Sequence, residues 1–130
     1  MIRLIPIFGV ERLKTAKIPN DANVVIATIQ RLFSLLSGDD FIDDDNEADY
    51  VVDGTRNMNL PVHPNLPPDY FDLIIIDECH RSIYGSWRSV LNILVLSKMI
   101  GLTATPAVET LAFFNNNLIV NYTLEKSIVD

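Results

Sequence analysis

The clearest hydrophobic pattern in the chain is a run of four apolar residues, Leu73–Ile76, that ends abruptly in polar ones. Three of the four are β-branched isoleucines, and such an uninterrupted run predicts a strand buried on both faces of a parallel sheet. Asp77 and Glu78 follow directly, and the strand is expected to end there because both are poor strand formers. The pattern favours an α/β fold in which polar side chains lie at the carboxyl edge of a parallel sheet, where such sheets place their ligands.

A second apolar run, Lys98–Leu102, predicts another strand about one βα unit later, and it ends in Thr103–Pro106. A polar turn after one buried strand is common, but two strand ends with polar clusters in this order are less expected by chance. Paired carboxylates at such an edge can hold a hydrated Mg²⁺ on a nucleotide and orient an attacking water. Between the two strands, Ser86–Leu96 is predicted to be a helix whose apolar face carries Trp87, Val90, Leu91 and Leu94.

The N-terminal half shows one further strand-to-helix unit. Val24–Ala27 is predicted to be a buried strand, Thr28 an N-cap, and Gly38 the end of the helix between them. Backbone N–H groups at the start of this helix could receive a phosphate, and Arg31 could pair with the same anion. The remaining expectations are strands at Arg3–Phe8 and Leu118–Val120, a connector with a turn at Glu11–Asn20, and a helix from Pro106 to about Phe114.

The length and composition of the chain predict a single folded domain with an acidic insertion. The chain has 130 residues, 48% of them hydrophobic, and its single cysteine, Cys79, allows no internal disulfide and fits a reducing cytoplasm. No apolar run approaches the length of a membrane span. The net charge of −7 comes from a segment between Gly38 and Asp53 that contains eight acidic residues and no basic one. The remainder of the chain has nine acidic and ten basic residues. Its charge therefore neither supports nor excludes a polyanion partner. Residues 39–69, acidic and then Pro-rich, predict a mobile surface insertion.

The polar clusters resemble those of a known family. Asp77-Glu78-Cys79-His80 resembles the Walker B (DEAD/DEAH-type) motif of superfamily-two helicases, and Thr103-Ala104-Thr105-Pro106 resembles their motif III. The string from Phe71 to Tyr84 is most similar to the motor domain of type I restriction enzyme R subunits, and Phe113-Phe114 also fits that family. The resemblance implies an incomplete RecA-like P-loop NTPase domain: a parallel sheet flanked by helices, with residues 1–130 forming part of the first helicase domain.

The resemblance also implies roles for individual residues. Asp77 would bind the Mg²⁺ of Mg-ATP, mostly through water, and Glu78 would position and activate the attacking water. His80 would link this nucleotide site to Thr103 and Thr105 by hydrogen bonds. The Thr-x-x-Arg motif, with Thr28, Gln30 and Arg31, would contact the backbone of the DNA strand along which the motor moves. The alternative for this motif is a capping threonine followed by a surface arginine.

One absence limits what the chain can do alone. None of its five glycines precedes a lysine, so the Gly-Lys-Ser/Thr P-loop that cradles the phosphates is missing. We therefore expect an ATP-dependent translocase or helicase fragment that is inactive in isolation. In the complete system its partners would be ATP, double-stranded DNA, and the methylase and specificity subunits, without a membrane. Two alternatives remain open: the motor of a non-restriction DNA helicase, and a non-catalytic remnant or interaction module.

Overall fold

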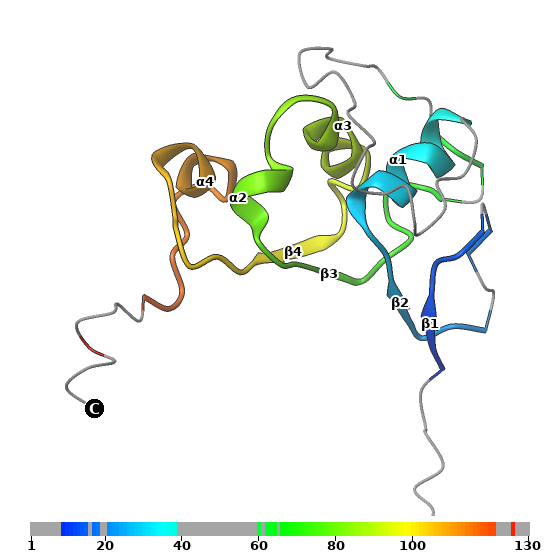
Figure 1. Cartoon of the computed structure of the whole chain (residues 1–130), viewed down its shortest axis with the longest axis horizontal. Helices are drawn as coiled ribbons and strands as arrows, with labels where there is room; N and C mark the ends of the chain where they lie inside the picture. Colours follow the sequence, from blue (N-terminus) through cyan, green and yellow to red (C-terminus); the bar gives the residue numbers. More distant parts are fainter. Residues whose placement is uncertain are drawn as a thin grey trace, which may run out of the picture.

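The structure, a computed structural model, describes residues 9–15, 17–18, 21–38, 60, 62–64, 66–121 and 126. Helices and strands alternate along most of this part of the chain, as expected for an α/β protein (Figure 1). The strands are β1 (Val10–Arg12), β2 (Val24–Ile26), β3 (Leu73–Ile76) and β4 (Lys98–Gly101). The helices are α1 (Ile29–Ser37), α2 (Cys79–Ser82), α3 (Gly85–Ile93) and α4 (Val108–Phe113).

The strands form two separate pairs, and both pairs are parallel. In the first, Val10 of β1 lies opposite Val24 of β2; in the second, β3 and β4 are in register from Leu73↔Lys98 to Ile76↔Gly101. The prediction that Leu73–Ile76 and the run beginning at Lys98 are strands of a parallel sheet is therefore confirmed, and the structure shows that the two pair directly. Because Ile76 and Gly101 are register partners, the residues that follow them leave the sheet at the same edge.

Helix α1 begins and ends where the sequence predicts. The Thr28 side chain accepts a hydrogen bond from the Arg31 backbone N–H at 3.4 Å, which is long but fits an N-cap. Gly38 closes the helix in the left-handed conformation, with φ of 75°, and its N–H bonds to the Ser34 carbonyl. The N-cap at Thr28 and the C-cap at Gly38 thus define the two ends of the helix. The buried side chains of the helix include Phe33, Leu35 and Leu36.

The core lies between α1, α3 and the helix-facing side of β3. Phe33 of α1 packs edge-to-face against Trp87 of α3 with ring centroids 5.7 Å apart, so Trp87 makes a core contact, as predicted. Leu66 is fully buried in the same cluster, although it belongs to the predicted mobile insertion. The C-terminal end of residues 39–69 is therefore anchored in the core, while residues 39–59 lie outside the described part of the chain.

The prediction that the strands are buried is wrong for β2, where Val24 and Ile26 are exposed to 46% and 56%, and it is also wrong for β3. Its residues alternate, with Ile76 buried and Leu73 and Ile75 exposed to 49% and 62%. Figure 1 shows the reason: the four helices lie on one side of β3 and β4, and no described element covers the other side. Ile100 of β4 is also exposed, at 39%. The pair of strands β3 and β4 therefore has one apolar face that no described element covers.

Smaller differences concern the two ends of the chain. Val10–Arg12 forms β1 where the sequence predicts the start of a connector, because it pairs with β2. Leu118–Val120 is not a strand: it is exposed and pairs with no strand among the described residues. Arg3–Phe8 lies outside the described residues. Among the helices that are described, none is long and apolar enough to cross a membrane.

Candidate nucleotide site

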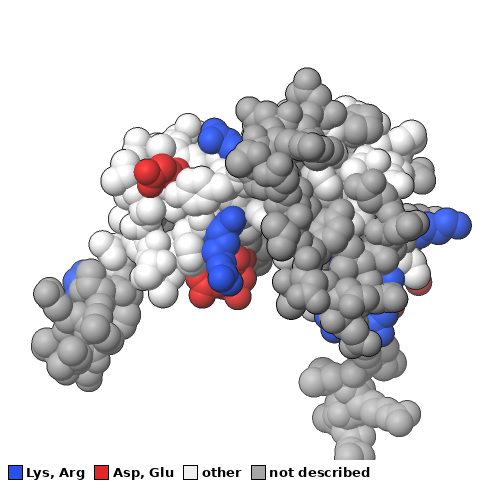
Figure 2. Space-filling model, turned by 45° about the horizontal axis from the view of Figure 1, so that its top comes forward, with Lys and Arg blue, Asp and Glu red and all other residues white. Residues whose placement is uncertain are grey.

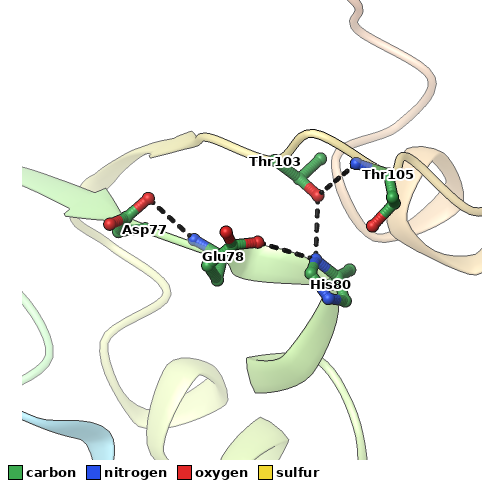
Figure 3. A network of polar contacts seen from close by, with 5 residues as sticks. All are labelled: Asp77, Glu78, His80, Thr103 and Thr105. Carbon is green, nitrogen blue, oxygen red and sulfur yellow. Dashed lines mark hydrogen bonds and ion pairs between the residues drawn. The ribbon is translucent and has the colours of Figure 1, made fainter.

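The candidate site lies at the carboxyl ends of β3 and β4. Two backbone hydrogen bonds hold the strand ends together beyond the sheet, from Leu102 N–H to the Ile76 carbonyl at 2.8 Å and from Cys79 N–H to the Leu102 carbonyl at 3.0 Å. These bonds fix the start of the loop after β4 against the turn after β3. Glu78 and His80 consequently lie beside Thr103 and Thr105, although the two pairs are far apart in the sequence (Figure 3).

Asp77 and Glu78 form a tight turn between β3 and α2. One carboxylate oxygen of Asp77, Oδ1, accepts a hydrogen bond from the Glu78 backbone N–H at 3.0 Å. Glu78 has φ of 46° and ψ of 44°, the left-handed region that residues other than glycine seldom adopt. Backbone strain of this kind is concentrated at functional sites. The turn separates the two carboxylates, so that Asp77 points back toward the strand end and Glu78 points toward His80 (Figure 3).

His80 connects the turn after β3 to the loop after β4. Its Nδ1 lies 2.8 Å from Thr103 Oγ1 and 3.3 Å from Glu78 Oε2. Thr103 Oγ1 also accepts a hydrogen bond from the Thr105 backbone N–H at 3.1 Å. The structure therefore brings Glu78, His80, Thr103 and Thr105 into one polar network (Figure 3), in which Thr105 takes part through its backbone N–H.

Cys79 packs into the apolar layer beneath this network and takes no part in it. It is 1% exposed and lies in a cluster with Ile76 and Leu91, and burial is the main reason why the pKa of its thiol is raised, with the Glu78 charge acting in the same direction. A raised pKa disfavours the thiolate, so this cysteine is suited to packing and not to nucleophilic chemistry.

Gly101 is a supporting residue that the sequence analysis did not single out. A Cβ at this position would lie 2.6 Å from the Phe114 ring and 2.8 Å from Cys79 Sγ. Only glycine therefore lets β4 approach α4 and Cys79 this closely at the strand end. The signal was present in the sequence, because an isolated glycine inside a strand pattern indicates a close approach.

The predicted DNA-contacting residues lie apart from this network, at the start of α1. Thr28 caps the helix and Gln30 is half-buried. Arg31 is only 3% exposed, and its Nη1 donates a 2.7 Å hydrogen bond to the Leu13 carbonyl. The alternative of a surface arginine is thus wrong, and a direct contact between Arg31 and DNA would require its side chain to leave this site.

Among the described residues, charged side chains do not by themselves single out a binding surface, and potential metal ligands do not cluster. In the described part of the face shown in Figure 2, basic side chains are scattered, and one near the middle lies against acidic ones. Among the described residues, no group of three or more histidine, cysteine, aspartate or glutamate side chains could hold a metal ion. Any cation here would depend on Asp77 together with water and a ligand, which is how Mg²⁺ is commonly bound with nucleotides.

Residues 8–108 match the family described as "Type III restriction enzyme, res subunit", and because this is most of the chain, the protein belongs to that family. The chain is also 43% identical over 70 residues to a protein of Escherichia coli described as "Type I restriction enzyme EcoAI endonuclease subunit". That alignment covers 48% of this chain and 8% of the length of the relative. No solved structure matches. The resemblance to restriction-enzyme helicase motors, drawn from residues 71–84 and 103–106, is therefore confirmed.

Proposed function

We propose that this chain is part of an ATP-dependent motor that moves on double-stranded DNA, of the kind that a type I restriction enzyme contains. The single observation that carries the proposal is the network in which His80 joins Glu78 to Thr103 across the carboxyl ends of two paired parallel strands. A motor needs its ATP-hydrolysing site to be coupled to a second segment. The contacts of His80 with Glu78 and Thr103 would provide this coupling. The family match and the E. coli relative support the same proposal.

The fold proposed for the complete motor is a RecA-like domain. β3, β4 and the helices on one of their faces would form part of its parallel sheet. Since parallel sheets are generally covered on both faces, the exposed Leu73, Ile75 and Ile100 support the view that further elements complete the sheet in the whole protein. The matched part of the chain spans 8% of the length of the E. coli relative.

The residues at the site fit Mg-ATP. The Asp77 side chain is exposed at the strand end, and the hydrogen bond to its Oδ1 holds the carboxylate in place. One carboxylate, water and nucleotide phosphates form a common Mg²⁺ environment, so Asp77 would hold the ion mostly through water. Bound Mg²⁺ would neutralise the charge that develops on the phosphates.

The other residues would act around this centre. Glu78 would orient the attacking water and accept its proton, and His80 would transmit the position of Glu78 to Thr103 and Thr105. Thr28, Gln30 and Arg31 would support contact with the DNA backbone, with Arg31 contributing from a buried position by holding the start of α1 against the segment after β1. The partners of the complete enzyme would be the methylase and specificity subunits, in the cytoplasm.

The proposal is tested by a segment exchange. Residues 8–108 of this chain, which match the family, replace the corresponding segment of the E. coli relative, and DNA-stimulated ATP hydrolysis is measured with and without Glu78→Gln. We expect hydrolysis in the exchange variant, and we expect Glu78→Gln to keep ATP binding and lower turnover by at least about 100-fold, the usual scale of a lost general base. Normal turnover by the Glu78→Gln variant would remove Glu78 from the mechanism.

A second experiment concerns the isolated chain. Without a Gly-Lys-Ser/Thr P-loop, residues 1–130 lack the lysine and backbone cradle for the phosphates, so we expect no appreciable ATP hydrolysis. Robust turnover by the purified chain would disprove this. The same missing P-loop favours the second candidate, a non-catalytic interaction module or remnant. An exchange variant that folds but neither binds nor hydrolyses ATP would support that candidate over the motor.

A further inference from the structure

Arg31, one of the residues expected to contact DNA, is held inside the protein. It is 3% exposed, and its Nη1 donates a hydrogen bond to the Leu13 carbonyl at 2.7 Å. Pairing with a phosphate would break this buried bond and leave the carbonyl without its charged donor, which is costly. A contact between the start of α1 and the DNA backbone therefore needs its positive charge from another side chain.

The segment that Arg31 holds carries two exposed basic residues. Arg12 ends β1 and Lys14 follows two positions later, and both are exposed, whereas Leu13 between them is fully buried. The Leu13 N–H bonds to the Ile26 carbonyl at 2.8 Å, so the pairing with β2 continues beyond the end of β1. Successive side chains of an extended segment point to opposite sides. Arg12 and Lys14 therefore project together, away from the side on which Leu13 is buried.

These two cations lie at the carboxyl ends of a pair of parallel strands. β1 and β2 run side by side, with Arg12 opposite Ile26, and α1 begins shortly after β2 ends (Figure 1). The bond from Arg31 to the Leu13 carbonyl sets the segment after β1 against the first turn of α1. Open parallel sheets place their ligands at this edge. The position of the two cations, and not the density of charge, therefore marks this surface.

The acidic residues of the same stretch lie elsewhere. Residues 9–38 contain two acids, Glu11 and Asp21. Glu11 directly precedes Arg12 in β1, so it projects to the opposite side of the strand. Asp21 lies at the amino ends of the strands, where its carbonyl oxygen is close to Gly9. Within the described residues of this stretch, the side that Arg12 and Lys14 share therefore carries no acidic side chain.

We propose that Lys14 and Arg12 make the direct contacts with the phosphate backbone of DNA at this edge, and that Arg31 positions the segment that carries them. The inference rests on the proposed function and names the residues of its DNA-contacting site. Side chains two residues apart in an extended segment start about 6.6 Å from each other, a spacing on the scale of neighbouring phosphates in one strand. Phosphate contacts carry no sequence information, which suits a motor that moves along DNA of any sequence.

The test measures binding of a labelled duplex by fluorescence anisotropy, without nucleotide, over a range of salt concentrations. The protein is the exchange variant that carries residues 8–108 in the E. coli relative. Each phosphate contact contributes about 0.9 to the slope of log affinity against log salt concentration. We expect Lys14→Gln to reduce the slope by about 0.9 and Arg12→Gln/Lys14→Gln by about 1.8, with binding at 0.1 M salt weaker by about tenfold or more. Two duplexes of unrelated sequence should show the same losses.

Two further variants provide the controls. Lys98→Gln removes the same charge from an exposed position at the amino end of β4, and it should leave the slope unchanged. Arg31→Met is added to Arg12→Gln/Lys14→Gln to separate positioning from contact. If Arg31 only positions the segment, its loss has no further effect on the slope once both exposed cations are gone. An Arg31 that pairs with a phosphate would lower the slope by about 0.9 more.

Three results would overturn the inference: a wild-type slope in the Lys14→Gln and double variants, an equal loss in Lys98→Gln, or a further loss on adding Arg31→Met. If the exchange variant does not fold, the whole 130-residue chain is titrated with a short duplex at about 20 mM salt, where screening is weak. Amide NMR shifts are then expected at residues 12–14. Shifts that occur only elsewhere, or not at all, would equally overturn the inference.

The outcome for the motor is read separately, from ATP hydrolysis. Loss of hydrolysis in the exchange variant, together with the expected changes in slope, would refute the motor role and leave the contacts of Arg12 and Lys14 standing. DNA-stimulated hydrolysis that depends on Glu78, together with an unchanged slope in the Arg12 and Lys14 variants, would refute only these contacts.

Discussion

The Arg31 guanidinium and the Leu13 carbonyl form a buried hydrogen bond of 2.7 Å that joins the first turn of α1 to the segment after β1. Leu13 is fully buried, and its own N–H bonds to the Ile26 carbonyl at the end of β2. The bond therefore ties together the helix, the end of its preceding strand and the segment that follows the neighbouring strand. A hydrogen bond with a charged donor at a buried position contributes more to stability than an exposed one.

We expect Arg31→Met to lower the free energy of unfolding by about 1–3 kcal/mol, because the Leu13 carbonyl would lose its charged donor in a buried place. Urea unfolding of the 130-residue chain measures this. Lys14→Met is the matched control, since Lys14 is exposed and its replacement should change stability by less than about 0.5 kcal/mol. Equal effects of the two substitutions would show that Arg31 is not anchored as described.

A second prediction concerns the uncovered face of β3. It compares how much stability is lost when each of two neighbouring isoleucines is replaced by alanine. Ile76 is 8% exposed and packs in the core, so Ile76→Ala should cost about 2–5 kcal/mol of stability. Ile75 points to the uncovered side, at 62% exposed, and Ile75→Ala should cost less than about 1 kcal/mol. Urea unfolding distinguishes the two. A similar large loss for both would mean that a further segment covers Ile75 in solution.

These residues also show what the sequence could and could not predict. The run Leu73–Ile76 identified the strand and its end at Asp77, because both depend on local preferences and on neighbours in the sequence. It did not predict the exposed face of Leu73 and Ile75, because an apolar run indicates affinity for burial and not the presence of a covering layer. Helix α1 was predicted with both its caps, Thr28 and Gly38, for the same local reasons.

The structural features that the sequence did not predict share a different cause, because they depend on contacts between residues far apart in the chain. The burial of Arg31 depends on a carbonyl 18 residues earlier, and that of Leu66 depends on packing against α1 and α3. Nothing in the local pattern around either residue indicates these partners. The polar network was anticipated because its motifs resemble a known family, but the contact between Glu78 and His80 was not.

A third prediction concerns Gly101, where β4 touches α4. Gly101→Ala places a methyl group 2.6 Å from the Phe114 ring, which must shift, so we expect a loss of about 1–3 kcal/mol of stability. Phe114→Leu would remove part of the ring and make room. The double variant should therefore lose less than the sum of the two single losses, as measured by a double-mutant cycle in urea. Strict additivity would show that the ring and the new methyl group do not meet.

The last prediction uses the strained backbone of Glu78. With φ of 46° this residue bears a cost of about 1–2 kcal/mol that asparagine and glycine largely avoid. The contact of Glu78 with His80 is half-exposed and offsets less than about 1 kcal/mol of this. Glu78→Asn and Glu78→Gly should therefore raise the urea midpoint of the chain, whereas Glu78→Ala, which loses the same carboxylate but keeps a Cβ, should not. If the alanine variant were as stable as the asparagine one, the left-handed turn would not be the source of the gain. The gain in stability from Glu78→Asn would show that the proposed catalytic carboxylate is kept at the expense of the stability of the fold.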